Sequence, residues 1–269
     1  MNEKYERLLK YIKGLGHIAV ALSGGVDSGF LLHAAVDAVG SENVAALTAT
    51  TLLHRADELD FSRELAARYG VAHRVIELDP LAIEAVRFNR IDRCYHCKRA
   101  IFTALWDATH LMGIENLADG TNADDTGVYR PGLAALAELG VVSPLKECGL
   151  TKAEIRDIAG DFGLNIAKKP SRPCLATRLP YDVELEPAII HMIAEGEKTL
   201  EGFGLNQFRL RHHGDIARIE AETSDFAKIL ELRKELTAAL KALGYRHITL
   251  DLQGFRSGSF DEKPQNGIE

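Results

Sequence analysis

The chain lacks the features that mark secreted, membrane-spanning and nucleic-acid-binding proteins. Its 269 residues include four cysteines, too few for a disulfide framework at this length. No apolar run approaches the length of a membrane span, and residues 1–7 lack the apolar core of a signal peptide. Basic residues are not in excess either, because 32 Lys and Arg stand against 39 Asp and Glu, a formal net charge of −7.

These absences narrow the class of protein. A net negative chain is not built to neutralise a nucleic-acid backbone. We therefore expect a cytoplasmic location and neither a membrane nor a nucleic-acid partner. In a reducing compartment the cysteines stay available for metal, nucleophilic or redox chemistry. The chain is long enough to bury a sizeable core in one large or two smaller domains.

A glycine-rich turn between a predicted strand and a predicted helix is the most informative feature. The apolar segment 17–22 leads into Ser23-Gly24-Gly25-Val26-Asp27-Ser28, and an apolar helical pattern follows from Phe30. The first N–H groups of a helix lack intrahelical acceptors and lie at its positive dipole end, so such a turn binds anions. The glycines let the backbone approach phosphates, the serines offer hydroxyl groups, and Asp27 suits Mg²⁺.

The spacing of this turn distinguishes it from other nucleotide-binding loops. It has neither the Gly-Lys-Ser/Thr ending of a Walker loop nor the G-x-G-x-x-G of dinucleotide folds. The six residues 23–28 resemble the PP-loop of ATP pyrophosphatases, which cleave ATP to AMP and pyrophosphate. An ordinary Ser/Gly turn is the alternative, but it would not require two glycines, two serines and an aspartate at a strand-to-helix junction.

Strand and helix patterns alternate through the first part of the chain. Strands are predicted at 17–22, 44–48, 73–78, 116–119 and 141–145, with helices that include 58–69, 97–111 and 152–162. This α/β pattern predicts an open parallel sheet with helices on both faces, of the PP-loop ATP pyrophosphatase type. We expect residues 1–180 to form an ATP-binding and adenylating domain that also carries the catalytic cysteine loop.

The pattern changes after residue 180. A smaller α+β domain is predicted over 181–269, contributing to substrate binding and assembly. Its predicted elements are helices at 184–201 and 224–242 and strands at 207–213, 216–221 and 248–252.

A second polar segment follows the predicted strand 116–119. It reads Asp119-Gly120-Thr121-Asn122-Ala123-Asp124-Asp125. Ligands of open parallel sheets bind outside the carboxyl ends of the strands, where both this segment and 23–28 fall. We expect Thr121, Asn122, Asp124 and the nearby Arg130 to contact ribose, phosphate or a phosphate-bound cation. An Asx-rich surface turn is the alternative.

The cysteines carry a third signal. Cys174 lies between Arg172 and Arg178 in a proline-containing loop, and nearby guanidinium charge favours the nucleophilic thiolate. We predict that Cys174 is catalytic; the alternative is a small buried loop residue. Cys148 is expected to be structural.

Cys94 and Cys97 form a C-x-x-C motif at a predicted helix start, and three interpretations stay open. A zinc site would need Cys174 and either Cys148 or His96 as further ligands. A redox disulfide is the second interpretation. The third is an iron–sulfur cluster held by three thiolates, with one iron open. The spacing alone does not choose between them.

Together these motifs resemble the LarE family across nearly the whole chain. LarE proteins are ATP-dependent sulfurtransferases that thiolate pyridinium-3,5-biscarboxylic acid mononucleotide during synthesis of the nickel-pincer nucleotide cofactor of lactate racemase. The resemblance rests on residues 23–28, 93–98, 119–122, 170–178, 209–215, 249–252 and 254–258.

The resemblance implies a two-stage reaction with ATP and Mg²⁺. A substrate carboxylate attacks the α-phosphate to give an acyl-adenylate, and sulfur then displaces AMP. Family members with one loop cysteine give up its sulfur and are consumed, whereas members with three cysteines hold a [4Fe-4S] cluster that carries a transferable sulfide. Cys94, Cys97 and Cys174 predict the cluster type, with Cys174 catalytic.

The resemblance also indicates substrate-binding residues and partners. Arg209 and Arg211 alternate on a predicted strand, share one face, and suit a phosphate or carboxylate; a solvated strand face is the alternative. Arg178 and Glu197 are predicted to accompany them. The expected partners are the nucleotide substrate, other maturation proteins of the same cofactor, and further copies of this chain.

Three other functions compete with this one. Amide-forming PP-loop ligases share the ATP chemistry but give no role to Cys174. A PP-loop tRNA thiolase would use both the thiols and ATP, although the net charge disfavours an RNA substrate. A nucleotide-sensing protein would use the same fold without turnover.

Overall fold

The computed structural model describes residues 2–127, 131–169 and 173–256. Contacts divide the chain into two compact units, Met1–Ile83 with Asp92–Arg172, and Glu84–Ile91 with Pro173–Glu269. This division differs from a single boundary at residue 180, because the short segment 84–91 and the loop that carries Cys174 both belong to the second unit.

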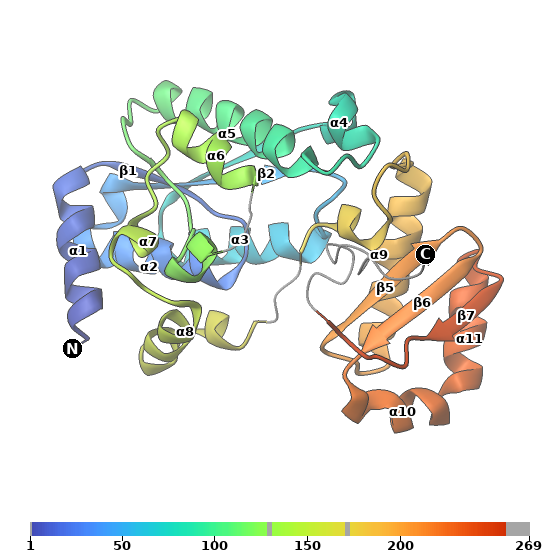
Figure 1. The fold of residues 1–269 in the computed structure, drawn as a ribbon. Coiled ribbons are helices and arrows are strands. Elements are labelled where there is room, and N and C mark those ends of the chain that lie inside the picture. The colour runs from blue at the N-terminus through green and yellow to red at the C-terminus, as the bar shows by residue number, and fades with distance from the viewer. Residues whose placement is uncertain (1, 128–130, 170–172, 257–269) are drawn as a thin grey trace. The chain divides into compact units, whose positions relative to one another are not determined.

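The first unit is built on a four-stranded parallel sheet of order β3-β2-β1-β4 (Figure 1). This confirms the predicted open parallel α/β sheet. Its strands are β1 Ile18–Ala21, β2 Val44–Thr50, β3 Ala72–Glu77 and β4 Leu117–Ala118. Its helices are α1 Glu3–Leu15, α2 Val26–Val39, α3 Ala56–Tyr69, α5 Arg93–Leu111, α6 Pro131–Glu138, α7 Pro144–Glu147 and α8 Lys152–Asp161. Short 3-10 turns lie at Ser41–Asn43, Pro80–Ala82, Ala123–Gly127 and Asn165–Lys168.

Both faces of this sheet are covered. Side chains alternate along a strand, so neighbouring residues of β1 enter different cores. Val20 packs in the core that includes α1, α2 and α8, whereas Ala19 packs in the core that includes α5. The central strands β1 and β2 therefore read as nearly continuous apolar runs, as expected of parallel strands buried on both sides, whereas the edge strand β3 is more exposed.

One predicted strand is wrong. Residues 141–145 contribute a single parallel bridge, between Val142 and Ala118, and helix α7 begins at Pro144. Proline has no N–H to donate to a strand ladder, and its fixed φ suits the first turn of a helix. Pro144 therefore ends the extended segment early.

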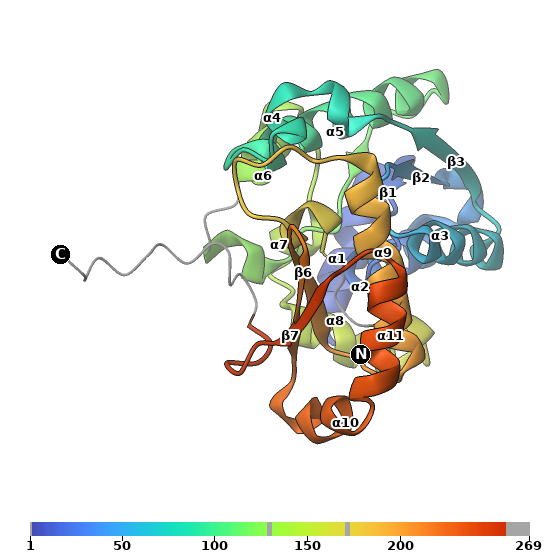
Figure 2. The same ribbon diagram turned by 90° about the vertical axis from the view of Figure 1, so that its right-hand side faces the viewer.

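The second unit contains a mixed three-stranded sheet of order β5-β6-β7 (Figure 1), and Figure 2 shows β6 beside β7. Strand β5 (Phe208–His213) runs antiparallel to β6 (Ile216–Ala221), and β7 (His247–Leu250) runs parallel to β6. The helices are α4 Glu84–Arg87, α9 Pro187–Gly202, α10 Phe226–Glu231 and α11 Arg233–Ala242, with 3-10 turns at Leu175–Arg178 and Thr223–Asp225. The predicted helix over 224–242 is interrupted at Leu232, between α10 and α11.

Helix α9 packs closely on this sheet. A Cβ atom at Gly196 would lie 2.3 Å from Leu210 Cδ2, so the glycine lets α9 approach β5. Leu200, Leu210 and Leu240 form part of one apolar core that joins α9, β5 and α11. Across the described ranges, no helix has the length and apolar character needed to cross a membrane.

Candidate functional site

The turn after β1 has the geometry expected of a phosphate-binding loop. Gly24 has φ +77°, and a Cβ atom there would lie 2.5 Å from the carbonyl oxygen of Glu58, so this position requires glycine. Helix α2 begins at Val26 after Gly25, and no side chain caps it. The first amide groups of α2 are therefore not engaged by a capping side chain and are available to an anion.

The two serines of the turn form hydrogen bonds within it. Ser28 Oγ accepts a hydrogen bond from Ser23 N at 3.2 Å and donates one to Gly25 O at 3.2 Å. The Ser23 and Ser28 hydroxyl oxygens lie 3.1 Å apart. These contacts connect the two ends of the turn to each other and to the carbonyl group of Gly25.

The second predicted segment meets this loop at the same edge of the sheet. A Cβ atom at Gly120 would lie 2.7 Å from Ser28 N, so the backbone after β4 packs directly on the start of α2. Asn122 Nδ2 donates to Asp27 Oδ2 at 3.2 Å. The fold thus brings the segment around Asn122 against the 23–28 turn.

Asp27 has one oxygen left for a ligand. Asp27 Oδ1 is buried and has no hydrogen-bond partner in the part of the chain that the structure describes. Burial raises the pKa of Asp27, although the positive charge of Lys152 and the Asn122 amide oppose this shift. A buried, unpartnered carboxylate oxygen beside a phosphate-binding turn suits a cation or a ligand hydrogen-bond donor.

The remaining predicted residues of this segment support its backbone. Thr121 Oγ1 donates to Asp119 Oδ2, and Ser143 Oγ donates to Asp119 Oδ1 at 2.6 Å. Asp124 Oδ2 accepts from Lys152 N at 2.8 Å, at the first turn of α8. Arg130 lies outside the described residues.

Lys169 is a cation at the loop that the sequence patterns did not single out. Its Nζ donates to Gly24 O at 2.6 Å and lies 3.9 Å from the centroid of the Phe61 ring. Arg156 Nη2 donates to the carbonyl of Lys169 at 2.8 Å and fixes the backbone there. Two lysines before Pro170 were visible in the sequence, but nothing in their spacing linked them to residue 24.

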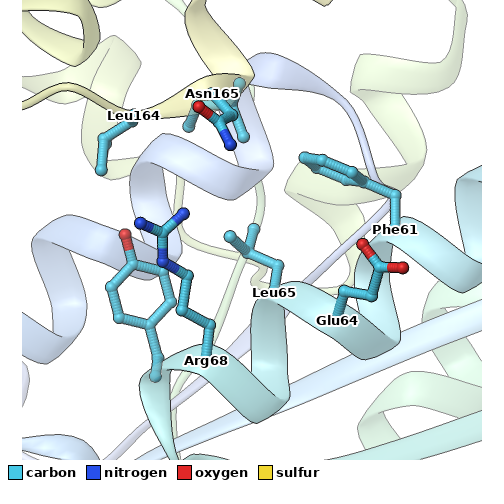
Figure 3. Close-up of a pocket in the computed structure, with 8 residues that line it drawn as sticks. Phe61, Glu64, Leu65, Arg68, Leu164 and Asn165 are labelled. Carbon is cyan, nitrogen blue, oxygen red and sulfur yellow. The ribbon is translucent and has the colours of Figure 1, made fainter.

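A pocket adjoins this region on α3. Its lining includes Phe61, Leu65 and Arg68 from α3, facing Leu164 and Asn165 (Figure 3). None of the predicted ATP-binding residues lines it. Phe61 connects it to the loop, because the same ring lies under Lys169 Nζ.

The cysteines are divided between the two units. Cys94 is exposed and Cys97 is half-buried in the first turn of α5, whereas Cys174 is half-buried directly before the turn Leu175–Arg178 of the second unit. Cys148 is buried in the core with α1 and α2, and burial raises the pKa of its thiol, which fits the structural role predicted for it. Within the described ranges, no three His, Cys, Asp or Glu side chains converge as metal ligands.

The second unit gathers the four predicted substrate-binding residues. Arg178 forms two hydrogen bonds with Glu197, Nε to Oε1 at 2.6 Å and Nη2 to Oε2 at 3.1 Å. Arg211 Nε donates to Glu220 Oε2 at 2.9 Å. The Arg209 guanidinium lies 4.8 Å from the centroid of the Phe255 ring.

Burial sets the electrostatics of this arginine cluster. Arg178 and Glu197 are 1% and 4% exposed at their side chains, and Arg209 and Arg211 are also buried, so the solvated strand face considered as an alternative is wrong. Burial alone would raise the pKa of Glu197, but the Arg178 charge and hydrogen bonds hold it below its usual value. Burial lowers the pKa of Arg209 to about 10.

Comparisons with known proteins find a matching family model and relatives that align with nearly the whole chain. The asparagine synthase family model matches residues 13–113, which include the 23–28 turn. The chain is 34% identical to pyridinium-3,5-bisthiocarboxylic acid mononucleotide synthase of Lactiplantibacillus plantarum, over 96% of this chain and 94% of that protein. It is 33% identical to an uncharacterized protein of Synechocystis, over 97% and 98% of the two chains. An uncharacterized protein of Methanocaldococcus jannaschii is 29% identical over 89% and 91%.

The contact between Lys169 and the loop predicts a role in ATP affinity. We expect Lys169→Met to raise the Kd of a non-hydrolysable ATP analogue roughly 10- to 100-fold, because a hydrogen bond to a charged group contributes about 1.5–3 kcal/mol. Isothermal titration calorimetry measures this change. Lys169→Arg should retain most of the affinity, and Lys13→Met on the exposed face of α1 should retain all of it. An unchanged Kd for Lys169→Met would exclude the role.

Proposed function

The chain belongs to the LarE family of ATP-dependent PP-loop sulfurtransferases, and we propose that it converts the carboxylates of pyridinium-3,5-biscarboxylic acid mononucleotide into thiocarboxylates. The observation that carries the proposal is the PP-loop packed against the 119–122 segment at the carboxyl edge of the parallel sheet. Family membership supplies the substrate class, and the cysteines supply the reason for sulfur chemistry.

The first half-reaction would take place at the PP-loop. The amide groups at the start of α2 would bind the phosphates, and Lys169 would add positive charge beside Gly24. A substrate carboxylate oxygen attacks the α-phosphorus of ATP, the bond to the bridging oxygen breaks, and pyrophosphate leaves with the electron pair. The products of this step are an acyl-adenylate and pyrophosphate. Thr121, Asn122, Asp124 and Arg130 are proposed to complete the nucleotide site.

Mg²⁺ fits the donor atoms at this place. Asp27 Oδ1 is a buried oxygen that accepts no hydrogen bond in the described structure, and hard oxygen ligands are those that Mg²⁺ prefers. We propose that Asp27 holds the ion, directly or through its bound water, and that the ion neutralises charge on the leaving pyrophosphate.

The second half-reaction is assigned to sulfur at Cys174. A sulfur nucleophile attacks the acyl carbon, and AMP leaves with the electrons of the acyl–oxygen bond. Cys94 and Cys97 lie three positions apart at the start of α5, so their side chains share one face, and we propose these two thiols and that of Cys174 as the ligands that would bind a [4Fe-4S] cluster. When bound there, such a cluster would supply a transferable sulfide.

The substrate would bind through the arginine cluster of the second unit. Arg178, Arg209 and Arg211 carry guanidinium groups suited to a phosphate or carboxylate, and Glu197 balances part of this charge. Arg178 pairs with Glu197, Arg211 pairs with Glu220, and the Arg209 guanidinium lies over the Phe255 ring. We propose that the three guanidinium groups together bind the anionic groups of the substrate.

Turnover with defined substrates tests the proposal. The protein, reconstituted with iron and sulfide and incubated with sulfide, ATP, Mg²⁺ and the biscarboxylic acid mononucleotide, should release pyrophosphate only when the mononucleotide is present. Mass spectrometry should then detect the thiocarboxylate. Release that requires tRNA instead would favour a tRNA thiolase, and nucleotide binding without any release would favour a sensor.

Iron content tests the assignment of the three cysteines. After purification without oxygen and reconstitution with iron and sulfide, the wild type should hold about four irons per chain and be brown. Cys94→Ala and Cys174→Ala should both lose iron and colour, whereas Cys148→Ala, a substitution in the buried core, should keep them. A colourless wild type whose Cys174 becomes dehydroalanine on turnover would instead show a sacrificial sulfur donor.

The raised pKa of Asp27 predicts a pH dependence of Mg²⁺ affinity. Only the carboxylate binds the ion, so affinity should fall as pH drops through a pKa above that of an exposed aspartate, and ion binding should release a proton. Calorimetric titration of the nucleotide complex with Mg²⁺ in buffers of different ionisation enthalpy measures this proton. The Asp27→Asn variant should bind Mg²⁺ weakly and without releasing this proton. Equal proton release by the variant and the wild type would contradict the assignment.

A further inference from the structure

The turn that presents Cys174 is closed immediately behind the cysteine. Cys174 O accepts hydrogen bonds from Thr177 N at 3.0 Å and from Thr177 Oγ1 at 2.8 Å. The turn Leu175–Arg178 therefore starts at the carbonyl of Cys174, while the cysteine itself stays half-buried rather than enclosed. The position of the sulfur depends on how firmly this turn is held.

Asn89 binds the backbone of this turn from a distant part of the sequence. Its Nδ2 donates to Pro180 O at 2.6 Å, to Leu179 O at 3.2 Å and to Ala176 O at 3.4 Å. The side chain is completely buried, and Asn89 Oδ1 has no hydrogen-bond partner among the described residues. The amide therefore acts as a donor group aimed at three carbonyls on one short loop.

The backbone of Asn89 is specialised for this position. Its φ is +49°, in the left-handed region that asparagine adopts more readily than most residues. Asn89 O accepts from Asp182 N at 3.3 Å, and Arg87 O accepts from Leu185 N at 2.6 Å. The segment 84–91 thus lies along the chain that follows the Cys174 loop, within the same unit.

Two buried arginines also donate hydrogen bonds to the loop that carries Cys174. Arg178 Nη1 donates to Thr177 Oγ1 at 2.6 Å and to Pro173 O at 3.2 Å, while its other nitrogens bind Glu197. Arg211 Nη1 donates to Thr177 O. Side chains of the buried residues Asn89, Arg178 and Arg211 therefore donate to the carbonyls at positions 173, 174, 176, 177, 179 and 180.

We propose that Asn89 is a positioning residue for Cys174. By holding the carbonyls on the far side of the turn, it keeps the sulfur in one place for transfer; this role rests on the proposed function of Cys174. Among the three buried donors, Asn89 is the best residue to substitute, because its side chain is neutral and its removal leaves no unpaired buried charge. Removal of Arg178 would leave Glu197 buried and unpaired, so loss of activity there would not separate positioning from folding.

Asn89→Asp tests this role with the least change in shape. The substitution replaces the N–H donors with an oxygen that faces three carbonyls. We expect thiocarboxylate formation to fall roughly 10- to 100-fold, because a misplacement of about 1 Å costs that much in rate. Substrate-dependent exchange of pyrophosphate into ATP, which reports the first half-reaction alone, should stay within about twofold of wild type.

Two further variants keep the test independent of folding. Asn89→Gly retains the positive φ and lacks the donor, so it should show the same selective loss. Asn116→Asp is the matched control, since Asn116 Nδ2 also donates to two backbone carbonyls, of Leu15 at 2.9 Å and His17 at 3.2 Å, in the other unit. In the Asn116→Asp variant, the ratio of the rate of thiocarboxylate formation to the rate of pyrophosphate exchange should equal that of the wild type.

The thiol itself gives a readout that does not require turnover. In the reduced, iron-free full-length protein, iodoacetamide should alkylate Cys174 several times faster in Asn89→Asp than in wild type, while exposed Cys94 reacts at an unchanged rate. Unchanged Cys174 reactivity, or an equal loss of exchange and sulfur transfer in folded variants, would overturn the role. A wild type that exchanges pyrophosphate but makes no thiocarboxylate would refute the proposed function, and the alkylation rates would still decide the role of Asn89.

Discussion

The close approach of two backbones at the carboxyl edge of the parallel sheet is the constraint on which the proposed ATP site depends. The segment after β4 packs on the start of α2 so tightly that Gly120 has no room for a Cβ atom beside Ser28 N. Gly24 is held in the same way against the carbonyl of Glu58. These contacts fix the backbone at the start of α2, and Asn122 donates a hydrogen bond to Asp27 beside it.

The second unit holds the half-buried Cys174, the residue proposed to carry the sulfur chemistry, directly before the turn Leu175–Arg178. In this unit, buried glutamates balance the charges of buried arginines. Glu197 neutralises Arg178, and Glu220 neutralises Arg211, so both guanidinium groups are available to bind backbone carbonyls of the turn after Cys174. Such pairs cost desolvation energy and are weak contributors to stability in themselves. Their value here is the fixed geometry of the loop.

Much of the fold was predictable from local pattern, and much of the site was not. The four parallel strands follow from apolar runs between helical periods, and the PP-loop follows from two glycines and two serines in sequence order. Local chemistry also explains the failures, because Pro144 ends an apolar run that otherwise matches a strand. Lys169 and Asn89 were missed for another reason. Lys169 donates to Gly24 O and Asn89 donates to Pro180 O, and both carbonyls lie far away in the sequence. Residue spacing and composition do not indicate such contacts.

In the proposed reaction a substrate carboxylate is adenylated before sulfur replaces its oxygen. The decisive experiment uses mononucleotide labelled with heavy oxygen in its carboxylates and follows the label by mass spectrometry of the nucleotide product. Attack of the carboxylate on the α-phosphorus transfers one labelled oxygen to AMP, so labelled AMP should form in equal amount to the thiocarboxylate. Thiocarboxylate accompanied by unlabelled AMP would show that sulfur enters without adenylation of the carboxylate.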